Sequence, residues 1–367
     1  MSYERDNIAK LQPYAPGEQP QSGKVIKLNT NEHPDLPCDA VRNALRQFDP
    51  ELLRRYPSPT AEPFRQLAGQ VHKVTSQQII ATNGGDELLR LLLTVFTQPG
   101  GKGIGVSDPT YSLYEVLAAI HDVPVVSIAR NQDWSLPDDY AQQLNDAGVN
   151  LAMIVNPHAP TGRLESVETL RRIAQQFNGV LLIDEAYTDF ATHDCLELVR
   201  EGSGLDNVIL LRTLSKGYSL AGLRFGYGIA SSPDLIVAMD KARDSYNTDA
   251  VSQVLACAAL SSQQTVAASW QKIIDQRTYM TQELTQRNWK ILPSQSNFIL
   301  AEPPPGSLKP TSATAEIEDA DRIYQTLKEM GIYVRYFNHP RLLNKLRITI
   351  GSIGQNNALL AAIDNMN

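Results

Sequence analysis

The sequence predicts an α/β fold with a large domain built on a mostly parallel sheet and a smaller α+β domain. Between residues 78 and 230, short runs rich in β-branched residues alternate with segments of helical period, as in βαβ units. Beyond about residue 255 the pattern becomes helix-rich, and 367 residues exceed the size at which one core stops growing. We therefore expect a large domain of residues 30–255 and a small domain of residues 1–29 and 256–367.

Seven segments are expected to form the strands of the large domain. Several of them are continuous apolar runs, which suit a sheet covered by helices on both faces. They are Gln78–Thr82, Gly103–Val106, Val123–Ile128, Asn150–Val155, Val180–Ile183, Val208–Leu211 and Phe225–Ala230.

The C-terminal part is expected to combine helices with short strands. Predicted helices are Val251–Ser261, Ala267–Asn288 and Asp319–Met330, and predicted strands are Ser296–Ala301, Ile332–Arg335 and Leu346–Ile350. Glu302–Ala320 is rich in proline, and proline cannot donate to a sheet. We therefore expect this segment to be a surface loop.

Composition argues for a soluble protein whose partners are small molecules. The net charge is −7 and no run of Lys or Arg stands out, so the basic footprint of a nucleic-acid binder is missing. Cys38, Cys195 and Cys257 are far apart, which fits neither a zinc site nor a disulfide framework. With no signal peptide or membrane-spanning run either, we expect a cytoplasmic protein without a metal site.

A glycine turn follows the first predicted strand and begins a helix. The turn contains Gly85 and Asp86, and free backbone N–H groups at a helix N-terminus can bind phosphate. The same pattern also occurs as an ordinary helix start with an acidic cap. The segment alone leaves both interpretations open.

A further predicted strand, Val180–Ile183, is followed by polar residues. Asp184 follows an apolar strand directly, and a carboxylate there is costly unless a cation, such as a pyridinium nitrogen, lies next to it. A helix cap or a Mg²⁺ ligand is the alternative role for Asp184. Tyr187 lies three residues on and could donate to a phenolate oxygen of the same ring.

Lys216 follows the next apolar strand and is flanked by hydroxyl groups. A lysine close to a core can act as an imine-forming nucleophile, because burial and nearby positive charge lower its pKa. Thr213, Ser215 and Arg224 offer donors for a phosphate, although a surface lysine with a solvated arginine would give the same pattern. Tyr111 follows another strand and could stack on a planar ring or simply pack.

These motifs, in this order, resemble the fold-type I aminotransferases, which depend on pyridoxal 5′-phosphate (PLP). The motifs are Asn83–Glu87, Pro109-Thr110-Tyr111, Pro160-Thr161-Gly162, Asp184-Glu185-Ala186-Tyr187 and Ser215-Lys216 with Arg224. Further motifs are most similar to the histidinol-phosphate aminotransferases: Leu11–Gly17, Leu28–Glu32, Arg55-Tyr56-Pro57, Ser296-Asn297-Phe298, Gly331–Arg335 and Leu346-Arg347-Ile348. The resemblance covers nearly the whole chain.

The resemblance implies a role for each candidate residue. Lys216 would carry the cofactor, Asp184 would pair with the ring nitrogen, Tyr187 would face the ring hydroxyl and Tyr111 would stack on the ring. The remaining cofactor contacts would come from Gly85, Asp86, Asn156, Thr213, Ser215 and Arg224, with Tyr56 reaching in from the second subunit of a homodimer.

The resemblance also implies the reaction. L-Histidinol phosphate would be the amino donor and 2-oxoglutarate the acceptor, giving glutamate, with Tyr14, Asn31, Arg335 and Arg347 binding the substrates. Three alternatives remain open: transamination of aromatic amino acids, a PLP-dependent decarboxylase or lyase acting on a phosphorylated amino acid, and a non-catalytic PLP-binding regulator. One arginine can bind a carboxylate or a phosphate, so the residues do not decide the preferred amino donor.

One position departs from the family pattern. Members commonly have Asn before Pro-Thr-Gly, and that Asn contacts the ring hydroxyl, whereas this chain has Ala159. Alanine cannot make that hydrogen bond. We expect either Asn156 to replace the contact or Tyr187 to suffice alone, and we expect His158 to be a loop residue.

Overall fold

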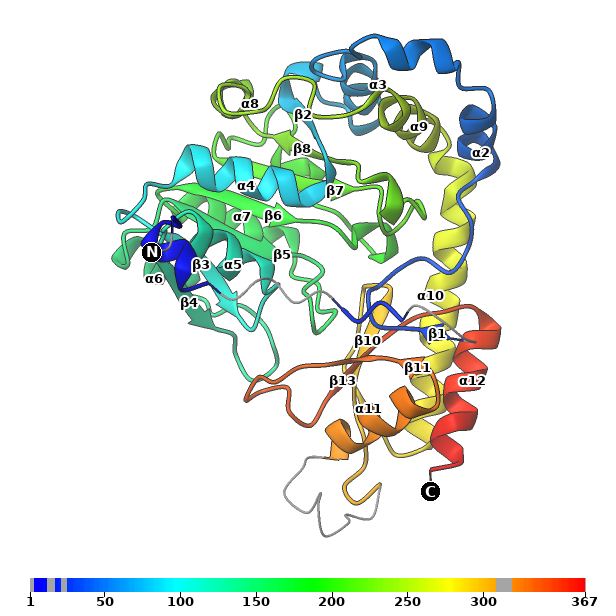
Figure 1. Cartoon of the computed structure of the whole chain (residues 1–367). Coiled ribbons are helices and arrows are strands. Elements are labelled where there is room, and N and C mark those ends of the chain that lie inside the picture. The colour runs from blue at the N-terminus through cyan, green and yellow to red at the C-terminus, as the bar shows by residue number, and fades with distance from the viewer. Residues whose placement is uncertain (1–2, 12–16, 21–24, 308–318, 367) are drawn as a thin grey trace.

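The largest feature of the computed structural model is a seven-stranded sheet (Figure 1). The structure describes residues 3–11, 17–20, 25–307 and 319–366. The strand order is β2-β8-β7-β6-β5-β3-β4; β8 is antiparallel to both neighbours and the other pairs are parallel. The bounds are β2 Ile79–Thr82, β3 Ile104–Asp108, β4 Val125–Ala129, β5 Leu151–Val155, β6 Val180–Asp184, β7 Val208–Thr213 and β8 Gly226–Ala230. The mostly parallel sheet predicted from the sequence is confirmed.

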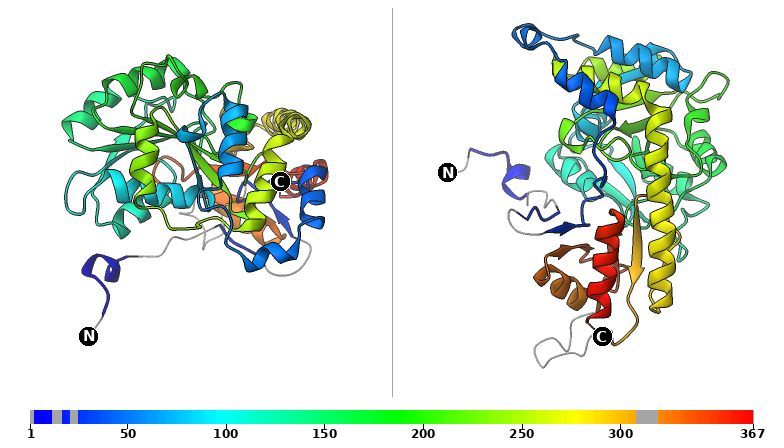
Figure 2. Two further views of the ribbon diagram at one scale, coloured as in Figure 1. Left: turned by 90° about the horizontal axis from the view of Figure 1, so that it is seen from above. Right: turned by 90° about the vertical axis from the view of Figure 1, so that its right-hand side faces the viewer.

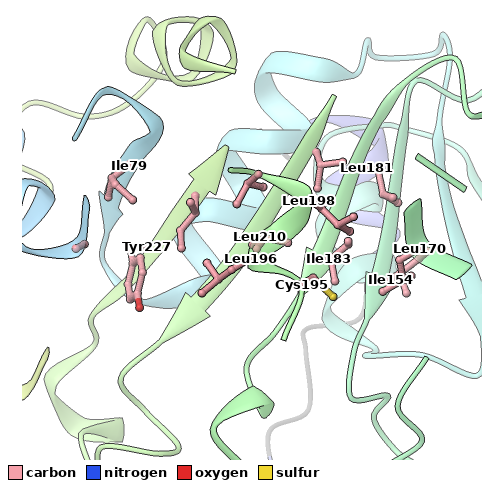
Figure 3. Packing of buried hydrophobic residues seen from close by; sticks show 14 of the residues in the cluster. Ile79, Ile154, Leu170, Leu181, Ile183, Cys195, Leu196, Leu198, Leu210 and Tyr227 are labelled. Atoms are coloured by element: carbon pink, nitrogen blue, oxygen red, sulfur yellow. The ribbon is translucent and has the colours of Figure 1, made fainter. Parts of the chain in front are cut away.

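Alternate residues of the strands pack against helices on opposite faces of the sheet. On β6, Leu181 and Ile183 join a core with residues of helices at 62–72, 140–146, 167–176 and 250–261, whereas Leu182 joins a core with residues of helices at 84–96, 113–120 and 233–240. Figure 3 shows the first core, with Ile183 beside Leu181 and Leu198. Burial on both faces explains why these strands are continuous apolar runs.

The helices of this large part cover the sheet or extend from it. Their bounds are α1 Asp6–Ala9, α2 Asp39–Arg46, α3 Glu62–His72, α4 Gly84–Phe96, α5 Leu113–Ile120, α6 Tyr140–Asp146, α7 Val167–Gln176, α8 Pro233–Asp240 and α9 Ala250–Ser261. Short 3₁₀ turns are η1 Pro50–Arg54, η2 Ser76–Gln78, η3 Thr188–Phe190, η4 Leu196–Leu198 and η5 Ala221–Leu223. Among the residues described, no helix is both long and apolar enough to cross a membrane.

The small part contains an antiparallel sheet in the order β12-β13-β10-β9, and a two-stranded sheet in which β1 pairs with β11. The long helix α10 runs from the large part along the small part beside α12 (Figures 1 and 2). The bounds are β1 Ile26–Lys27, α10 Gln263–Gln286, β9 Lys290–Ile291, β10 Phe298–Glu302, α11 Asp319–Glu329, β11 Ile332–Tyr333, β12 Arg335–Tyr336, β13 Leu346–Thr349 and α12 Ile353–Asp364.

Two sequence expectations for the small part need correction. The strand expected over Ile332–Arg335 is interrupted at Val334: β11 pairs with β1, and β12 pairs with β13. The loop expected over Glu302–Ala320 is shorter, since Glu302 belongs to β10 and α11 begins at Asp319; residues 308–318 lie outside the described chain.

The domain division expected from the sequence also differs in detail from the described contacts. Helix α9 continues through residue 255 and packs on α2 and α3. Near the N-terminus, Asn7 Nδ2 donates to the carbonyl of Ala119 at 3.0 Å, so α1 lies on α5 rather than on the small part. We therefore propose the α9–α10 junction as the second boundary.

We expect Val208→Ala to lower the free energy of unfolding by about 2 kcal/mol, because it removes two buried carbon atoms and leaves a cavity. Val208 is 0% exposed in the centre of the sheet. The matched control is Val237→Ala on α8, which is 57% exposed and should change stability by less than about 0.5 kcal/mol. Urea unfolding followed by circular dichroism measures both, and equal effects would contradict the packing described above.

Candidate functional site

A cavity of about 540 Å³ lies at the carboxyl ends of the parallel strands, and residues of the small part also line it. It brings together most residues singled out in the sequence. These are Asn31, Gly85, Asp86, Tyr111, Asp184, Tyr187, Thr213, Ser215, Lys216, Arg224, Arg335 and Arg347. Parallel sheets with this topology commonly bind ligands at that edge.

Lys216 extends its amine into the cavity from the loop after β7. Its Nζ donates to the carbonyl of Thr30 at 3.0 Å. Burial, helped by the positive charge of Arg347, lowers the pKa of Lys216 to about 8. A substantial neutral fraction is therefore present near physiological pH, and the neutral amine is the nucleophilic form.

The peptide after Lys216 is held from two sides by residues that the sequence did not indicate. Trp270 on α10 donates its Nε1 hydrogen to the Gly217 carbonyl at 2.6 Å. A Cβ at Gly217 would lie 2.1 Å from Oδ2 of Asp189, so only glycine fits there. These contacts fix the backbone that carries the lysine.

Asp184 ends β6 with a buried carboxylate. The hydroxyl of Tyr114 donates to Oδ2 at 2.9 Å, and the backbone N–H of Ala186 donates to Oδ1 at 3.0 Å. Burial raises the pKa of Asp184 to about 6 in spite of these two donors. A cationic partner in the cavity would stabilise the ionised form.

Tyr187 is oriented by residues distant in sequence. Asn31 Nδ2 donates to the Tyr187 hydroxyl at 2.9 Å, and Asn31 Oδ1 accepts a hydrogen bond from Thr349 Oγ1 at 3.0 Å. Asn297 donates to the carbonyl of Asn31 at 3.0 Å. Asn31 of the N-terminal segment, Thr349 on β13 and Asn297 just before β10 thus fix the Tyr187 side chain.

The N-terminus of α4 and the β7–β8 connection form an anion cradle. Gly84 has φ +74°, and a Cβ there would lie 2.6 Å from Arg224 Nη2. Arg224 Nη2 lies 3.2 Å from Asp86 Oδ2, and Thr213 Oγ1 donates to Ser215 Oγ at 2.9 Å. An arginine, two hydroxyl groups and a helix N-terminus facing one space suit a phosphate.

Two arginines line the cavity from the small part. Arg347 Nη2 donates to the carbonyl of Asn29 at 2.8 Å. The guanidinium groups of Arg335 and Arg347 lie 5.5 and 5.4 Å from the ring centroid of Phe337. Phe337 also lines the cavity, and no sequence motif had indicated it.

The structure places the Asn156 side chain outside the cavity lining. Its Oδ1 accepts from the backbone N–H of Glu165 at 2.8 Å and its Nδ2 points to the Glu165 carbonyl at 3.4 Å. The side chain is 1% exposed and does not line the cavity, whereas Ala159 does. Asn156 therefore holds the loop at Glu165, and its expected cofactor contact stays a prediction.

The other expected residues lie outside this cavity. His158 is buried and bonds to Thr161 Oγ1 at 2.7 Å and to the Pro109 carbonyl at 2.8 Å, as expected for a loop residue. Tyr56 is 81% exposed and stacks on Tyr246 at 4.5 Å. Tyr14 lies outside the described residues.

Comparisons with known proteins agree over nearly the full chain. The family model for aminotransferase class I and II matches residues 23–363. Histidinol-phosphate aminotransferase 1 of Trichormus variabilis is 40% identical over 99% of this chain and 98% of its own length.

Solved structures share the fold. Histidinol-phosphate aminotransferase from Sinorhizobium meliloti, in complex with pyridoxal-5′-phosphate, aligns with a TM-score of 0.86 at 23% identity, covering 100% of this chain and 99% of that one. L-Threonine-O-3-phosphate decarboxylase from Porphyromonas gingivalis aligns with a TM-score of 0.75 at 20% identity. The alignment covers 93% of this chain and 99% of that one. The fold alone therefore does not decide between transamination and decarboxylation. The family match and the full-length relative do identify the family, as the sequence motifs predicted: this chain belongs to the class I and II aminotransferases, among the relatives of the histidinol-phosphate aminotransferases.

Proposed function

We propose that this enzyme uses PLP to transfer the amino group of L-histidinol phosphate to 2-oxoglutarate, giving glutamate. The observation that carries the proposal is the placement of the buried Lys216 amine in one cavity with the Asp184 carboxylate, a phosphate cradle and two arginines. The similarity to histidinol-phosphate aminotransferases supports the choice of donor.

The residues present fit PLP. The cradle at Arg224, Thr213 and Ser215 suits its phosphate, and the buried Asp184, whose pKa is raised by burial, suits a protonated ring nitrogen. Tyr111 lines the same cavity and offers a ring for stacking. When bound, PLP supplies a carbonyl that condenses with amines and a ring that accepts the electron pair left at a substrate carbon.

The residues that line the cavity or support it then have distinct roles. Lys216 would provide the neutral amine that holds PLP and would move a proton at the substrate carbon. Asp184 would hold the protonated ring nitrogen, and Tyr114 donates a hydrogen bond that orients Asp184. Tyr187, oriented by Asn31, would donate a hydrogen bond to the oxygen of the ring hydroxyl. Among these residues, Tyr114 is the one that the sequence motifs did not suggest.

The two arginines of the small part support anionic substrates. Arg335 and Arg347 face the cavity on the side of the small part, and a guanidinium group binds either phosphate or carboxylate. One site can thus accept the phosphate of the donor and a carboxylate of the acceptor in turn. An aromatic amino acid has no phosphate, so its side chain would have no anionic group to bind to these arginines.

We further propose a cytoplasmic homodimer. Tyr56 is exposed, as expected of a residue that completes the second subunit's site, and it stacks on the exposed Tyr246. Further exposed apolar side chains lie on α2, η1 and α9 (Leu45, Leu52, Leu53 and Val254), and exposed apolar surface commonly marks a protein interface where it forms a patch. The three cysteines are unpaired, which suits a reducing compartment.

The assay with purified protein should show glutamate formation from L-histidinol phosphate and 2-oxoglutarate, with no release of CO₂. Lys216→Ala should still take up PLP through the phosphate cradle but lose at least about a thousandfold in kcat. Lys272→Ala, a change at a lysine whose side chain is 72% exposed, is the control and should keep full activity. Turnover of phenylalanine or tyrosine that is faster than turnover of L-histidinol phosphate would instead indicate an aromatic-amino-acid aminotransferase. Release of CO₂ would indicate a decarboxylase.

The acylation rate of Lys216 in the cofactor-free protein should rise with pH through a midpoint near 8, because burial and the charge of Arg347 hold its pKa at about that value. Arg347→Met removes a positive charge and should move the midpoint to higher pH. Competitive acetylation with mass spectrometry measures this rate. Arg171→Met, which removes a surface ion pair with Glu197, should leave the midpoint unchanged, and an unshifted Arg347→Met profile would contradict the electrostatic argument.

Tyr187→Phe should lower kcat/KM by about 10- to 100-fold, because no asparagine at position 159 shares its task. Ala159→Asn should restore part of the loss in the double variant, a coupling that a double-mutant cycle measures. Tyr140→Phe is the matched control, since that buried hydroxyl has no hydrogen-bond partner in the structure. Strictly additive effects would mean that a further group already contacts the ring hydroxyl.

A further inference from the structure

The loop after β12 returns to the large part and binds it at two points. His339 Nε2 lies 3.2 Å from Asp108 Oδ1. Arg341 donates from Nη1 to the carbonyl of Arg130 at 2.7 Å and from Nη2 to the carbonyl of Asn131 at 2.8 Å. The Arg341 guanidinium also lies 4.1 Å from the ring centroid of Trp134.

The loop that binds Arg341, residues 130–136, is itself held in place by buried polar contacts. The buried Arg130 pairs with Glu165 at 2.7 Å and also donates to the Trp134 carbonyl at 2.7 Å. The backbone N–H of Leu136 donates to the same Glu165 carboxylate at 3.1 Å. Trp134 itself has φ +69°, a conformation that non-glycine residues keep only where their surroundings enforce it. The two acceptor carbonyls therefore have fixed positions.

Trp134 connects this loop to the arginines of the cavity. Its ring is buried in one cluster with Leu300 and Leu342 of the small part, and Phe337 packs against that cluster. Phe337 in turn lies within 5.5 Å of the guanidinium groups of Arg335 and Arg347. An unbroken set of contacts thus leads from the large part to both arginines.

We propose that Arg341 and Trp134 form a lock between the two parts that positions Arg335 and Arg347 for an anionic group of the substrate. Neither Arg341 nor Trp134 lines the cavity, so both act as positioning residues. The cation–π contact and two carbonyl bonds give the lock its strength. The inference rests on the proposed function only in taking the anion to be a phosphate or carboxylate of the substrates.

The test compares anion binding with turnover in the cofactor-loaded enzyme. Arg341→Met and Trp134→Leu should each weaken binding of succinate, an unreactive dicarboxylate, by about tenfold in isothermal titration calorimetry. KM for L-histidinol phosphate should rise by a similar factor, while kcat, and kcat/KM for the unphosphorylated L-histidinol, should stay near the parent values. Trp134→Phe keeps an aromatic face under the guanidinium and should retain most of the affinity.

Controls separate the lock from general stability. Arg171→Met removes a comparable arginine that binds Glu197 and the Ser203 carbonyl within the large part, and it should leave succinate affinity unchanged. If Arg341→Met does not fold, Arg341→Lys and Trp134→Phe carry the comparison. The proposal is overturned if succinate affinity is unchanged in the lock variants, or if kcat falls equally for both donors. Because succinate binding needs no transamination, failure of the parent enzyme to use histidinol phosphate would sink the proposed function without deciding the lock.

Discussion

The burial of an acidic and a basic group in one cavity governs how this site is built. Burial raises the pKa of Asp184 to about 6 and lowers the pKa of Lys216 to about 8, so both groups are shifted toward their neutral forms. Each shift costs stability unless a ligand or a fixed dipole compensates. The surrounding polar contacts are therefore concentrated on these two residues: Tyr114 and Ala186 bind Asp184, and Thr30 binds Lys216. A cofactor with a cationic nitrogen and a reactive carbonyl would relieve both.

Strand alternation explains how the sheet can carry these charges. Asp184 faces the cavity, and the next residue, Glu185, points to the other side, where it pairs with Arg212 at 2.7 Å. Arg212 likewise precedes Thr213 on β7, so each strand end gives one residue to the cavity and one to a buried ion pair. Breaking such a pair would leave an uncompensated charge in the core, which is strongly destabilising. The pair thus ties the ends of β6 and β7 together directly behind the catalytic residues.

Sequence periodicity predicted the sheet well, because most of its strands are buried and read as apolar runs between turns. Asp184 and Lys216 became candidates because polar residues stand out close behind such runs. Hydrogen bonds between residues that are distant in sequence were not predicted. Asn31 donates to Tyr187, 156 residues away, and Trp270 donates to Gly217, 53 residues away. Asn156 became a candidate because it follows a predicted strand, whereas in the structure its amide oxygen accepts from the Glu165 backbone, a contact that the sequence did not indicate. The expected division at residue 255 stays a prediction, although α9 continues through that residue.

The contacts of the small part indicate how substrate binding and chemistry are coupled. Thr349 on β13 orients Asn31, which orients Tyr187, and Arg347 lies on the same strand. A shift of β13 would therefore move an anion-binding group and a cofactor-facing hydroxyl together. Trp270 lies on α10, the helix that joins the two parts, and holds the peptide after Lys216. In the proposed reaction, Arg347, Tyr187 and Lys216 would thus be connected through β13 and α10, so a substrate anion bound at Arg347 would lie on the same strand that orients Tyr187.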